Sequence, residues 1–221
     1  VIALDLAGHG RSSHRSMDSS YDIWIDIGEV IAVADQMGWE RFALLGHSRG
    51  AIISGLIAGT FPDRITQVAL IDGYVPMPHD ADNAAKQIMK AIRENKRFGG
   101  ASPTHFPDFD RAIQARVHGF VPLQLEAATL LANRGVVEGP RGYYWANDQR
   151  LKAASFVKFS KGHLEGFFTA IIARVLLIQA ENSAFSPDRQ QSELFGWVPH
   201  MQIQKMPGSH HLHLEDEAEQ V

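Results

Sequence analysis

The stretch FALLGHSRGAIISGLIAGTFP, residues 42–62, decides the fold of this chain. It begins with a short apolar run typical of a buried strand, continues through Gly-His-Ser-Arg-Gly, and ends in a run of small and apolar residues that favours a helix. A serine between a strand and a helix lies on a tight, strained turn that exposes its hydroxyl, here that of Ser48. Glycine is expected at positions 46 and 50 because side chains there would collide with the strand or the helix. The pattern therefore predicts a nucleophilic serine at the end of a parallel strand.

Strands and helices also alternate on both sides of this stretch. VIALDL, residues 1–6, and ITQVALID, residues 65–72, are short apolar runs that we expect to form buried strands. Residues 20–37 place apolar side chains on one helical face, and Gly38 is a suitable end for that helix. Strands that alternate with helices through short connections predict a parallel sheet with helices on both faces.

The pattern changes over residues 77–172, where we find no strand run. Helical stretches are expected at residues 81–98, 108–118, 122–134 and 161–172, with an irregular, aromatic-rich segment before the last. Strands are expected again at residues 174–179 and 201–206, with a helix within residues 186–197. The chain is therefore predicted to be an α/β protein whose core, residues 1–76 and 173–221, is interrupted by a helical cap at residues 77–172.

The composition excludes several other classes of protein. The 221 residues have a formal net charge of -4 and no stripe rich in lysine and arginine, so no nucleic-acid partner is expected. No apolar run approaches the roughly 18 residues that a membrane helix needs, and no signal peptide is recognisable, so we take a cytoplasmic location as the default. The chain has no cysteine, which excludes disulfides, cysteine-ligated zinc and thiol catalysis. No sequence feature sets an oligomeric state.

Four motifs together resemble the α/β-hydrolase superfamily, and within it the serine-hydrolase-like branch. They are DLAGHGRSSH at residues 5–14, GHSRG at 46–50, NDQRL at 147–151 and PGSHHLHLED at 207–216. The resemblance runs from end to end, and it implies a mostly parallel sheet flanked by helices with a helical cap between the sixth and seventh strands. A serine at position 48 disfavours epoxide hydrolase and haloalkane dehalogenase chemistry, since those related enzymes use an aspartate nucleophile.

The resemblance implies that His210 is the catalytic base. This histidine follows PGS directly after the last strand and precedes Glu215 by five residues, as the histidine does in the family's loop. His211 and His213 are the competing candidates. Histidines at this spacing can also bind zinc, but the sequence places no further ligand beside them, so no metal and no cofactor is expected.

A catalytic triad also needs a carboxylate that orients the imidazole and stabilises its cation. In many members of the superfamily this acid follows the seventh strand, at the position that Ser183 occupies within AENSAFSP, residues 180–187. We expect the acid to be Asp72 instead, because the ends of neighbouring parallel strands lie only about 4.8 Å apart. Glu181 is the main alternative, followed by Asn182, and Asp72 could also be a simple Asp-Gly turn residue.

The oxyanion hole is expected to use the backbone N–H of Arg49, the residue after the nucleophile. By resemblance, the second N–H comes from a loop that would precede Val1. The chain opens at Val1 inside a strand-like run without an initiator methionine, and it ends in LEDEAEQV, residues 214–221, which reads as a helix cut short. We therefore expect a chain truncated at both ends, with its N-terminal strands missing, and residues 1–221 alone are expected to be inactive.

The leading hypothesis for function is a serine hydrolase of the esterase type. It would act on a small ester or related acyl substrate through Ser48, His210 and Asp72, with an acyl-enzyme intermediate. The alternative is a catalytically weak or inactive protein with the same fold that binds a ligand or a partner. The serine at position 183, where an acid is usual, motivates this alternative.

Overall fold

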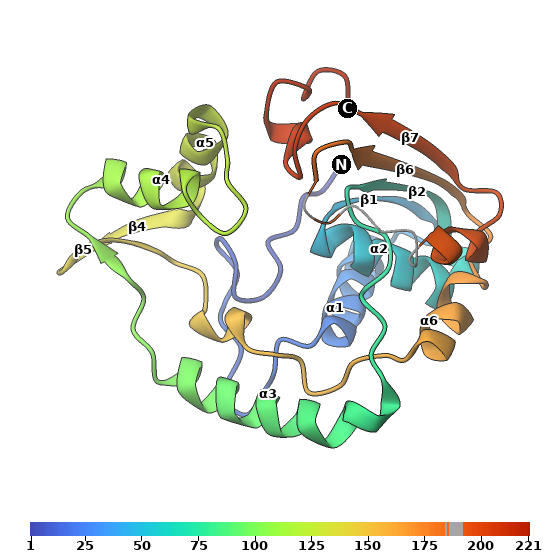
Figure 1. Ribbon diagram of the computed structural model, residues 1–221, viewed down its shortest axis with the longest axis horizontal. Coiled ribbons are helices and arrows are strands. Elements are labelled where there is room, and N and C mark those ends of the chain that lie inside the picture. Colours follow the sequence, from blue (N-terminus) through green and yellow to red (C-terminus); the bar gives the residue numbers. More distant parts are fainter. Residues whose placement is uncertain (184, 186–191) are drawn as a thin grey trace. The chain divides into compact units, whose positions relative to one another are not determined.

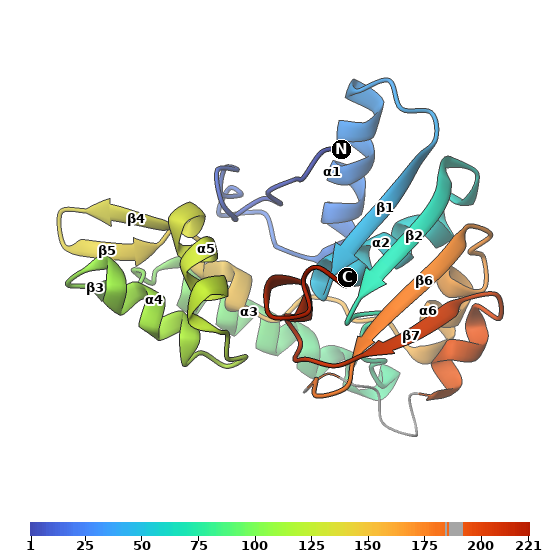
Figure 2. The ribbon, with the colours of Figure 1, turned by 90° about the horizontal axis from the view of Figure 1, so that it is seen from above.

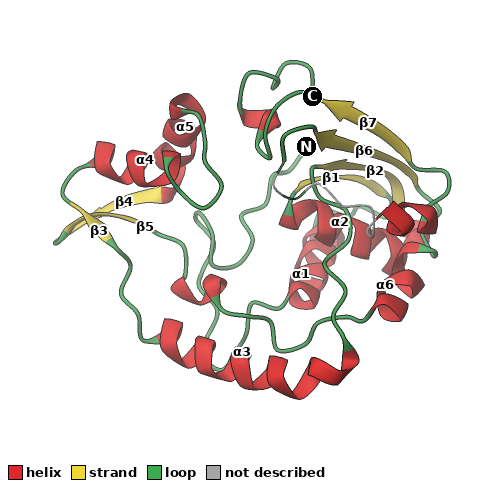
Figure 3. Cartoon of the chain, viewed as in Figure 1, coloured by secondary structure: helices red, strands yellow, loops and turns green. Residues whose placement is uncertain are grey.

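The chain forms two compact units. The structure, a computed structural model, describes residues 1–183, 185 and 192–221. The first unit, called the sheet unit here, contains residues 23–81 and 158–221, and the second, the helical unit, contains residues 1–22 and 82–157. Figure 1 and Figure 3 show the helices and strands of both units. The N-terminal 22 residues thus group with the helical segment, whereas the division of the chain into a hydrolase core and a cap stays a prediction.

Four parallel strands form the sheet of the sheet unit. They are β1 (Phe42–His47), β2 (Ile65–Ile71), β6 (Arg174–Ala180) and β7 (Gln202–Met206). They lie in the order β1-β2-β6-β7, and Figure 2 shows them side by side. The strands predicted from these stretches of sequence are therefore confirmed. The carboxyl ends of the four strands lie along one edge of the sheet.

Three α-helices of this unit, α1 (Ile23–Gln36), α2 (Arg49–Thr60) and α6 (Lys161–Phe168), lie on one side of the sheet (Figure 1). Helix α1 ends where predicted, before Gly38, which has a positive φ of 68°. Helices α2 and α6 approach closely at Gly59, where a Cβ atom would lie 2.0 Å from the carbonyl oxygen of Phe167. The sheet is thus flanked by helices, but in the described part of this unit they cover one face rather than both.

Short 3₁₀ turns complete the sheet unit. They are η1 (Pro62–Arg64), η4 (Ser192–Trp197) and η5 (Leu212–Leu214). The helix predicted within residues 186–197 is described only in its second half, where η4 lies, because residues 186–191 lie outside the described residues.

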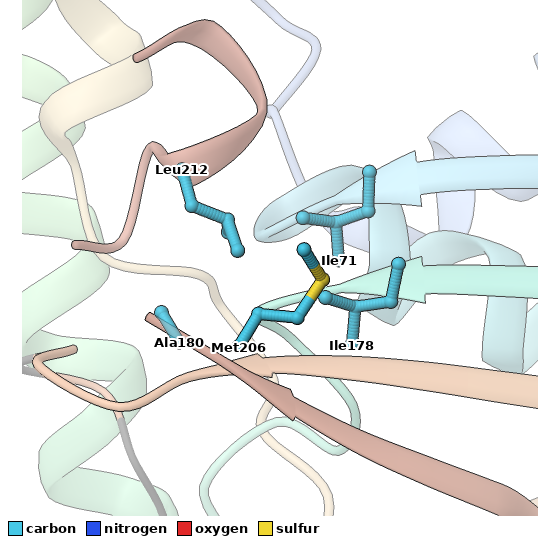
Figure 4. Packing of buried hydrophobic residues seen from close by; sticks show 5 residues of the cluster. All are labelled: Ile71, Ile178, Ala180, Met206 and Leu212. Atoms are coloured by element: carbon cyan, nitrogen blue, oxygen red, sulfur yellow. The ribbon is translucent and has the colours of Figure 1, made fainter. Parts of the chain in front are cut away.

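The loop after β7 packs on the sheet face opposite the helices, at the carboxyl edge (Figure 4). Ile71 and Ile178 are register partners on β2 and β6, and Ala180 and Met206 are the corresponding partners on β6 and β7. Leu212 of η5 covers this apolar cluster and has no exposed surface (0%). Burial of these side chains anchors the loop that carries the candidate catalytic histidine.

The helical unit contains α3 (Ala84–Gly99), α4 (Phe109–Val117) and α5 (Leu125–Gly135), where helices were predicted. Two 3₁₀ turns, η2 (Ala81–Asn83) and η3 (Gln149–Lys152), lie at the start of α3 and in the NDQRL motif. In the part of the chain that the structure describes, no helix is both long and apolar enough to cross a membrane.

A small antiparallel sheet also lies in the helical unit, so the prediction that residues 77–172 lack strands is wrong. Its strands are β3 (His105–Phe106), β4 (Val136–Gly139) and β5 (Gly142–Trp145), in the order β3-β5-β4. The strands are too short to show a clear pattern, and Gly139, Pro140 and Gly142 at the turn suggested irregular structure. Gly142, with φ of 99°, closes the tight hairpin, and a Cβ atom there would lie 2.2 Å from the carbonyl oxygen of Phe106.

The strand predicted at residues 1–6 is not formed. The structure assigns no strand to this segment, and the side chains of Val1, Ile2 and Leu4 are exposed. Apolar and β-branched residues favour an extended backbone, but a strand also needs a neighbour that completes its hydrogen-bond ladder. No described strand pairs with these residues.

A buried ion pair gives the NDQRL motif a structural role. Arg150 Nη2 lies 2.8 Å from Asp148 Oδ2, and the side chains are 5% and 8% exposed. Arg150 also donates to backbone carbonyls within residues 15–19, and Asp148 accepts a hydrogen bond from the Tyr21 hydroxyl. Burial by itself raises the pKa of Asp148, but the hydrogen bonds from Arg150 and Tyr21 outweigh it and lower that pKa to about 2. The pair therefore holds the loop before α1 within the helical unit.

Replacing Arg150 by methionine is predicted to lower the free energy of unfolding by about 3–5 kcal/mol, because Asp148 would be left buried without its cation. The matched control is Lys90→Met on α3, which removes the exposed partner of a pair with Glu94 at 3.9 Å and should cost less than about 0.5 kcal/mol. Urea unfolding followed by circular dichroism measures both values. Equal losses in the two variants would contradict the structural role of the buried pair.

Candidate active site

Ser48 lies on the turn between β1 and α2, as the sequence predicts. Its backbone has φ of 51° and ψ of -115°, a conformation that a non-glycine residue rarely adopts. The Ser48 N–H donates to the carbonyl of Ile71 over 2.9 Å, which extends the β1–β2 ladder by one residue. The strained turn is thus held at the carboxyl edge of the sheet.

The two glycines of GHSRG differ in whether a side chain would fit at their positions. A Cβ atom on Gly46 would lie 2.3 Å from the backbone carbonyl of Gly50, so the predicted steric requirement holds at position 46. At Gly50 a Cβ atom would meet no described atom within 4 Å, so the same expectation is wrong there. The close approach that the turn requires lies between β1 and the start of α2.

Asp72 follows β2 directly, one strand away from Ser48. It has φ of 41°, and Ser48 and Asp72 are the two non-glycine residues with positive φ among those that the structure describes. The Asp72 N–H donates to the carbonyl of Ile178 over 2.8 Å, so the turn after β2 also extends a ladder. A Cβ atom on Gly73 would lie 2.6 Å from the carbonyl oxygen of Ser48, which explains the glycine after Asp72.

His210 joins these two residues. Its Nδ1 atom lies 2.6 Å from Asp72 Oδ2, and its Nε2 atom lies 2.9 Å from Ser48 Oγ. The aspartate and histidine side chains are only 4% and 6% exposed. A carboxylate can only accept, so Nδ1 carries the proton, and Nε2 is free to accept from the serine hydroxyl. The structure thus brings together the three residues that the sequence selected.

Ser183, which occupies the position where many members of the superfamily carry the acid, contacts Asp72. Its hydroxyl donates to Asp72 Oδ2, and the backbone N–H of Ala180 donates to Asp72 Oδ1 over 3.1 Å. Burial raises the pKa of Asp72, but the hydrogen bonds from His210, Ser183 and the Ala180 N–H outweigh it, so the pKa lies below its usual value. The sequence drew attention to position 183 but did not predict that Ser183 hydrogen-bonds Asp72, because these two residues are distant in the chain.

The two alternative candidates for the orienting residue lie on the turn after β6 that also carries Ser183. The side chains of Glu181 and Asn182 are exposed, and their backbone N–H groups donate to the carbonyls of Met206 and Gly208. Among the described carboxylates, Asp72 is the one that hydrogen-bonds the His210 ring. The geometry therefore favours Asp72 over Glu181 as the orienting acid.

Four histidine rings gather at the end of β1. The ring of His47, on β1, lies with its centroid 4.6 Å from that of His210, 5.1 Å from that of His211 and 4.1 Å from that of His213. His47 was not among the residues predicted for the site, and the one signal in the sequence that points to it is its place directly before Ser48. Within the described residues, no group of three or more potential ligands could hold a metal ion.

Arg49 is the first residue of α2. The first intrahelical hydrogen bond near it runs from the Ile52 N–H to the Ser48 carbonyl, so the Arg49 N–H lies at the helix N-terminus beside the nucleophile. Its guanidinium forms an ion pair of 2.6 Å with Asp26 of α1, whose side chain is 2% exposed. The oxyanion role of the Arg49 N–H stays a prediction.

This fold and site define an α/β hydrolase. A family model described as the alpha/beta hydrolase fold matches residues 1–217, and the chain belongs to this family. The predicted fold class is therefore confirmed, as is the resemblance to the serine-hydrolase-like branch.

Curated relatives carry serine hydrolase-like names. The chain is 27% identical to Serine hydrolase-like protein 2 of Homo sapiens over 231 residues, which cover 97% of this chain and 74% of that protein. It is 23% identical to Serine hydrolase-like protein of Danio rerio, with 97% of this chain and 69% of that protein covered.

Solved structures agree closely in fold. A hypothetical protein of Pseudomonas aeruginosa is 39% identical, with 97% of this chain and 76% of that chain covered and a TM-score of 0.92. The thioesterase domain from the curacin biosynthetic pathway is 22% identical, with 98% and 77% covered and a TM-score of 0.83. The second likeness shows the shared fold alone.

Alanine substitution at the two glycines of GHSRG, Gly46 and Gly50, is predicted to have opposite effects on stability. Gly46→Ala forces a Cβ atom against the Gly50 backbone, 2.3 Å away, and should lower the free energy of unfolding by about 1–3 kcal/mol. Gly50→Ala enters open space at the start of α2 and should leave stability unchanged or raise it by up to about 1 kcal/mol. Urea unfolding of both variants checks the prediction, and a larger loss at position 50 would contradict it.

Proposed function

We propose that this protein is a serine hydrolase that cleaves a small ester or related acyl compound through an acyl-enzyme. The observation that carries the proposal is the hydrogen-bond chain from Ser48 through His210 to Asp72, with distances of 2.9 and 2.6 Å. A nucleophile, a base and an orienting acid in this mutual geometry are what activation of a serine hydroxyl requires. The names of the human and zebrafish relatives support the same class of reaction.

In the proposed reaction, Ser48 Oγ attacks the carbonyl carbon of the substrate while His210 Nε2 accepts the serine proton. The tetrahedral intermediate then collapses, the bond to the leaving group breaks, and His210 returns the proton to that group. Water next attacks the acyl-serine ester with His210 again as the base, which releases the acid product and restores Ser48. Asp72 stays ionised at neutral pH, because its pKa lies below the usual value, and it stabilises the imidazolium.

The negative charge that develops on the substrate oxygen needs donors that are already in place. The backbone N–H of Arg49 is the proposed first donor, since it lies at the N-terminal end of α2, where the helix dipole also favours an anion. The Arg49 guanidinium is paired with Asp26, so recognition of an acidic substrate group by this side chain is not part of the proposal.

A hollow beside the acid supports a substrate with a modest hydrocarbon portion. It reaches Asp72 and Gly73 and is lined in part by Tyr74, Leu194 and Phe195, all from the sheet unit. Aromatic and aliphatic linings of this kind suit an apolar acyl or alcohol group.

The alternative function, a weak or inactive protein that binds a ligand, drew its support from the serine at position 183. Because Asp72 hydrogen-bonds His210 and Ser183 hydrogen-bonds Asp72, that serine no longer argues for a missing acid. The hydrolase is therefore the better supported of the two functions.

A fluorophosphonate probe tests the proposal on the full-length protein. The probe reacts with activated serines, so we expect stoichiometric labelling of Ser48 in the wild type and no labelling of Ser48→Ala. Intact-mass spectrometry measures the adduct. A wild type that is not labelled, or a label that persists in Ser48→Ala, would remove the basis of the proposed function.

Asp72→Asn is predicted to lower kcat toward a p-nitrophenyl ester by about 10³–10⁴-fold, because an amide favours the wrong tautomer of His210 and cannot balance its positive charge. The matched control is Glu181→Gln, which makes the same change on an exposed side chain and should stay within about two-fold of the wild type. Steady-state kinetics of both variants decides between the two acids. A large loss in Glu181→Gln with little effect of Asp72→Asn would assign the role to Glu181.

A further inference from the structure

His47 is the residue before the proposed nucleophile, and its side chain points to the same sheet face as the loop after β7. It is the register partner of Ile71 on β2, and Ile71 belongs to the apolar cluster that Leu212 covers. From this position the Nε2 atom of His47 lies 2.7 Å from the backbone carbonyl oxygen of His210. A carbonyl can only accept a hydrogen bond, so Nε2 of His47 carries the proton and donates it.

The surroundings keep the His47 ring neutral. Burial, with the neighbouring rings of His213, His210 and His211, lowers the pKa of His47 to about 3, and the hydrogen bond to the His210 carbonyl opposes this only in part. Burial also lowers the pKa of His213, which packs against the His47 ring at 4.1 Å. At neutral pH, therefore, neither of these rings adds a positive charge beside His210.

The hydrogen bond from His47 links the two parts of the proposed catalytic machinery. One end is adjacent to Ser48 on β1, and the other is the main chain of His210 itself. Two further anchors of this loop lie on the other strands: Leu212 packs on β2, β6 and β7, and the Gly208 carbonyl accepts a hydrogen bond from the Asn182 N–H after β6. The His47 contact thus ties the loop directly to the strand that carries the nucleophile.

We propose that His47 is a positioning residue that, as a neutral Nε2–H imidazole, clamps the main chain of His210 and so holds its ring within hydrogen-bond distance of Ser48. The inference rests on the proposed function for its catalytic consequence, whereas the clamp itself is a property of the folded chain. Reactions of this kind depend steeply on small displacements of the base, so loss of the clamp should slow acylation.

Two variants with side chains of similar length distinguish the effect of the N–H donor of His47 from the effect of its ring. His47→Gln keeps an N–H donor at about the position of Nε2, and His47→Met removes it. We expect the rate constant for phosphonylation of Ser48 by a fluorophosphonate probe, which releases fluoride, to fall by about ten-fold or more in His47→Met and to stay within about three-fold of the wild type in His47→Gln. Burst titration of the active sites corrects for any fraction that fails to fold.

The two variants also distinguish positioning from simple stability. If His47 is a positioning residue, kcat toward a p-nitrophenyl ester should fall in His47→Met while KM changes little. The downfield proton signal of the His210–Asp72 hydrogen bond should also shift in His47→Met but not in His47→Gln. A wild-type rate of Ser48 phosphonylation per active site in His47→Met would overturn the inference while leaving the proposed hydrolase intact.

A measurement on the wild-type protein keeps the inference testable even if His47→Met does not fold or the chain proves inactive. Nitrogen-15 NMR of the imidazoles reports the tautomer of His47, which we expect to be the Nε2–H form without titration between about pH 5 and pH 8, given a pKa near 3. The ionisable groups nearest this ring are His210, His211 and His213. An Nδ1–H tautomer, or titration of His47 near its ordinary pKa, would show that the clamp does not exist.

Discussion

The parallel hydrogen-bond ladder of β1, β2 and β6 is the constraint on which the site depends. It continues one residue beyond β1 and β2, where the Ser48 N–H donates to Ile71 and the Asp72 N–H donates to Ile178. Because parallel strands end at the same edge, this extension sets the proposed nucleophile and acid one strand apart. The loop after β7 then needs to supply only the histidine that joins them.

Strained backbone conformations and close backbone contacts occur together at this edge of the sheet. Ser48 and Asp72 both hold positive φ values, and each conformation is supported by a glycine that lets backbones approach, Gly46 against Gly50 and Gly73 against Ser48. Unfavourable backbone conformations persist where the surrounding structure determines them, and they gather at functional sites. The histidine loop is held in a different way, by the apolar cluster under Leu212 and by the hydrogen bond from His47.

Local patterns predicted much of the fold and part of the site. The stretch at residues 42–62 was sufficient to predict β1, the strained turn and α2, because the spacing of apolar residues and of glycines is a pattern that extends over only a few residues. The short hairpin at β4 and β5 escaped prediction because four-residue strands carry little periodicity. The segment at residues 1–6 was predicted as a strand because composition alone cannot supply the neighbour that a ladder needs.

The sequence by itself determined which residues can do chemistry: Ser48 on its turn, the histidines after β7, and the carboxylates at the strand ends. Only the tertiary structure decided how they are used. It placed Asp72 rather than Glu181 against His210, turned Ser183 into a donor to that acid, and brought His47 to the His210 main chain. Such contacts join residues more than 100 positions apart, and they arise from strand order and register, which no local pattern encodes.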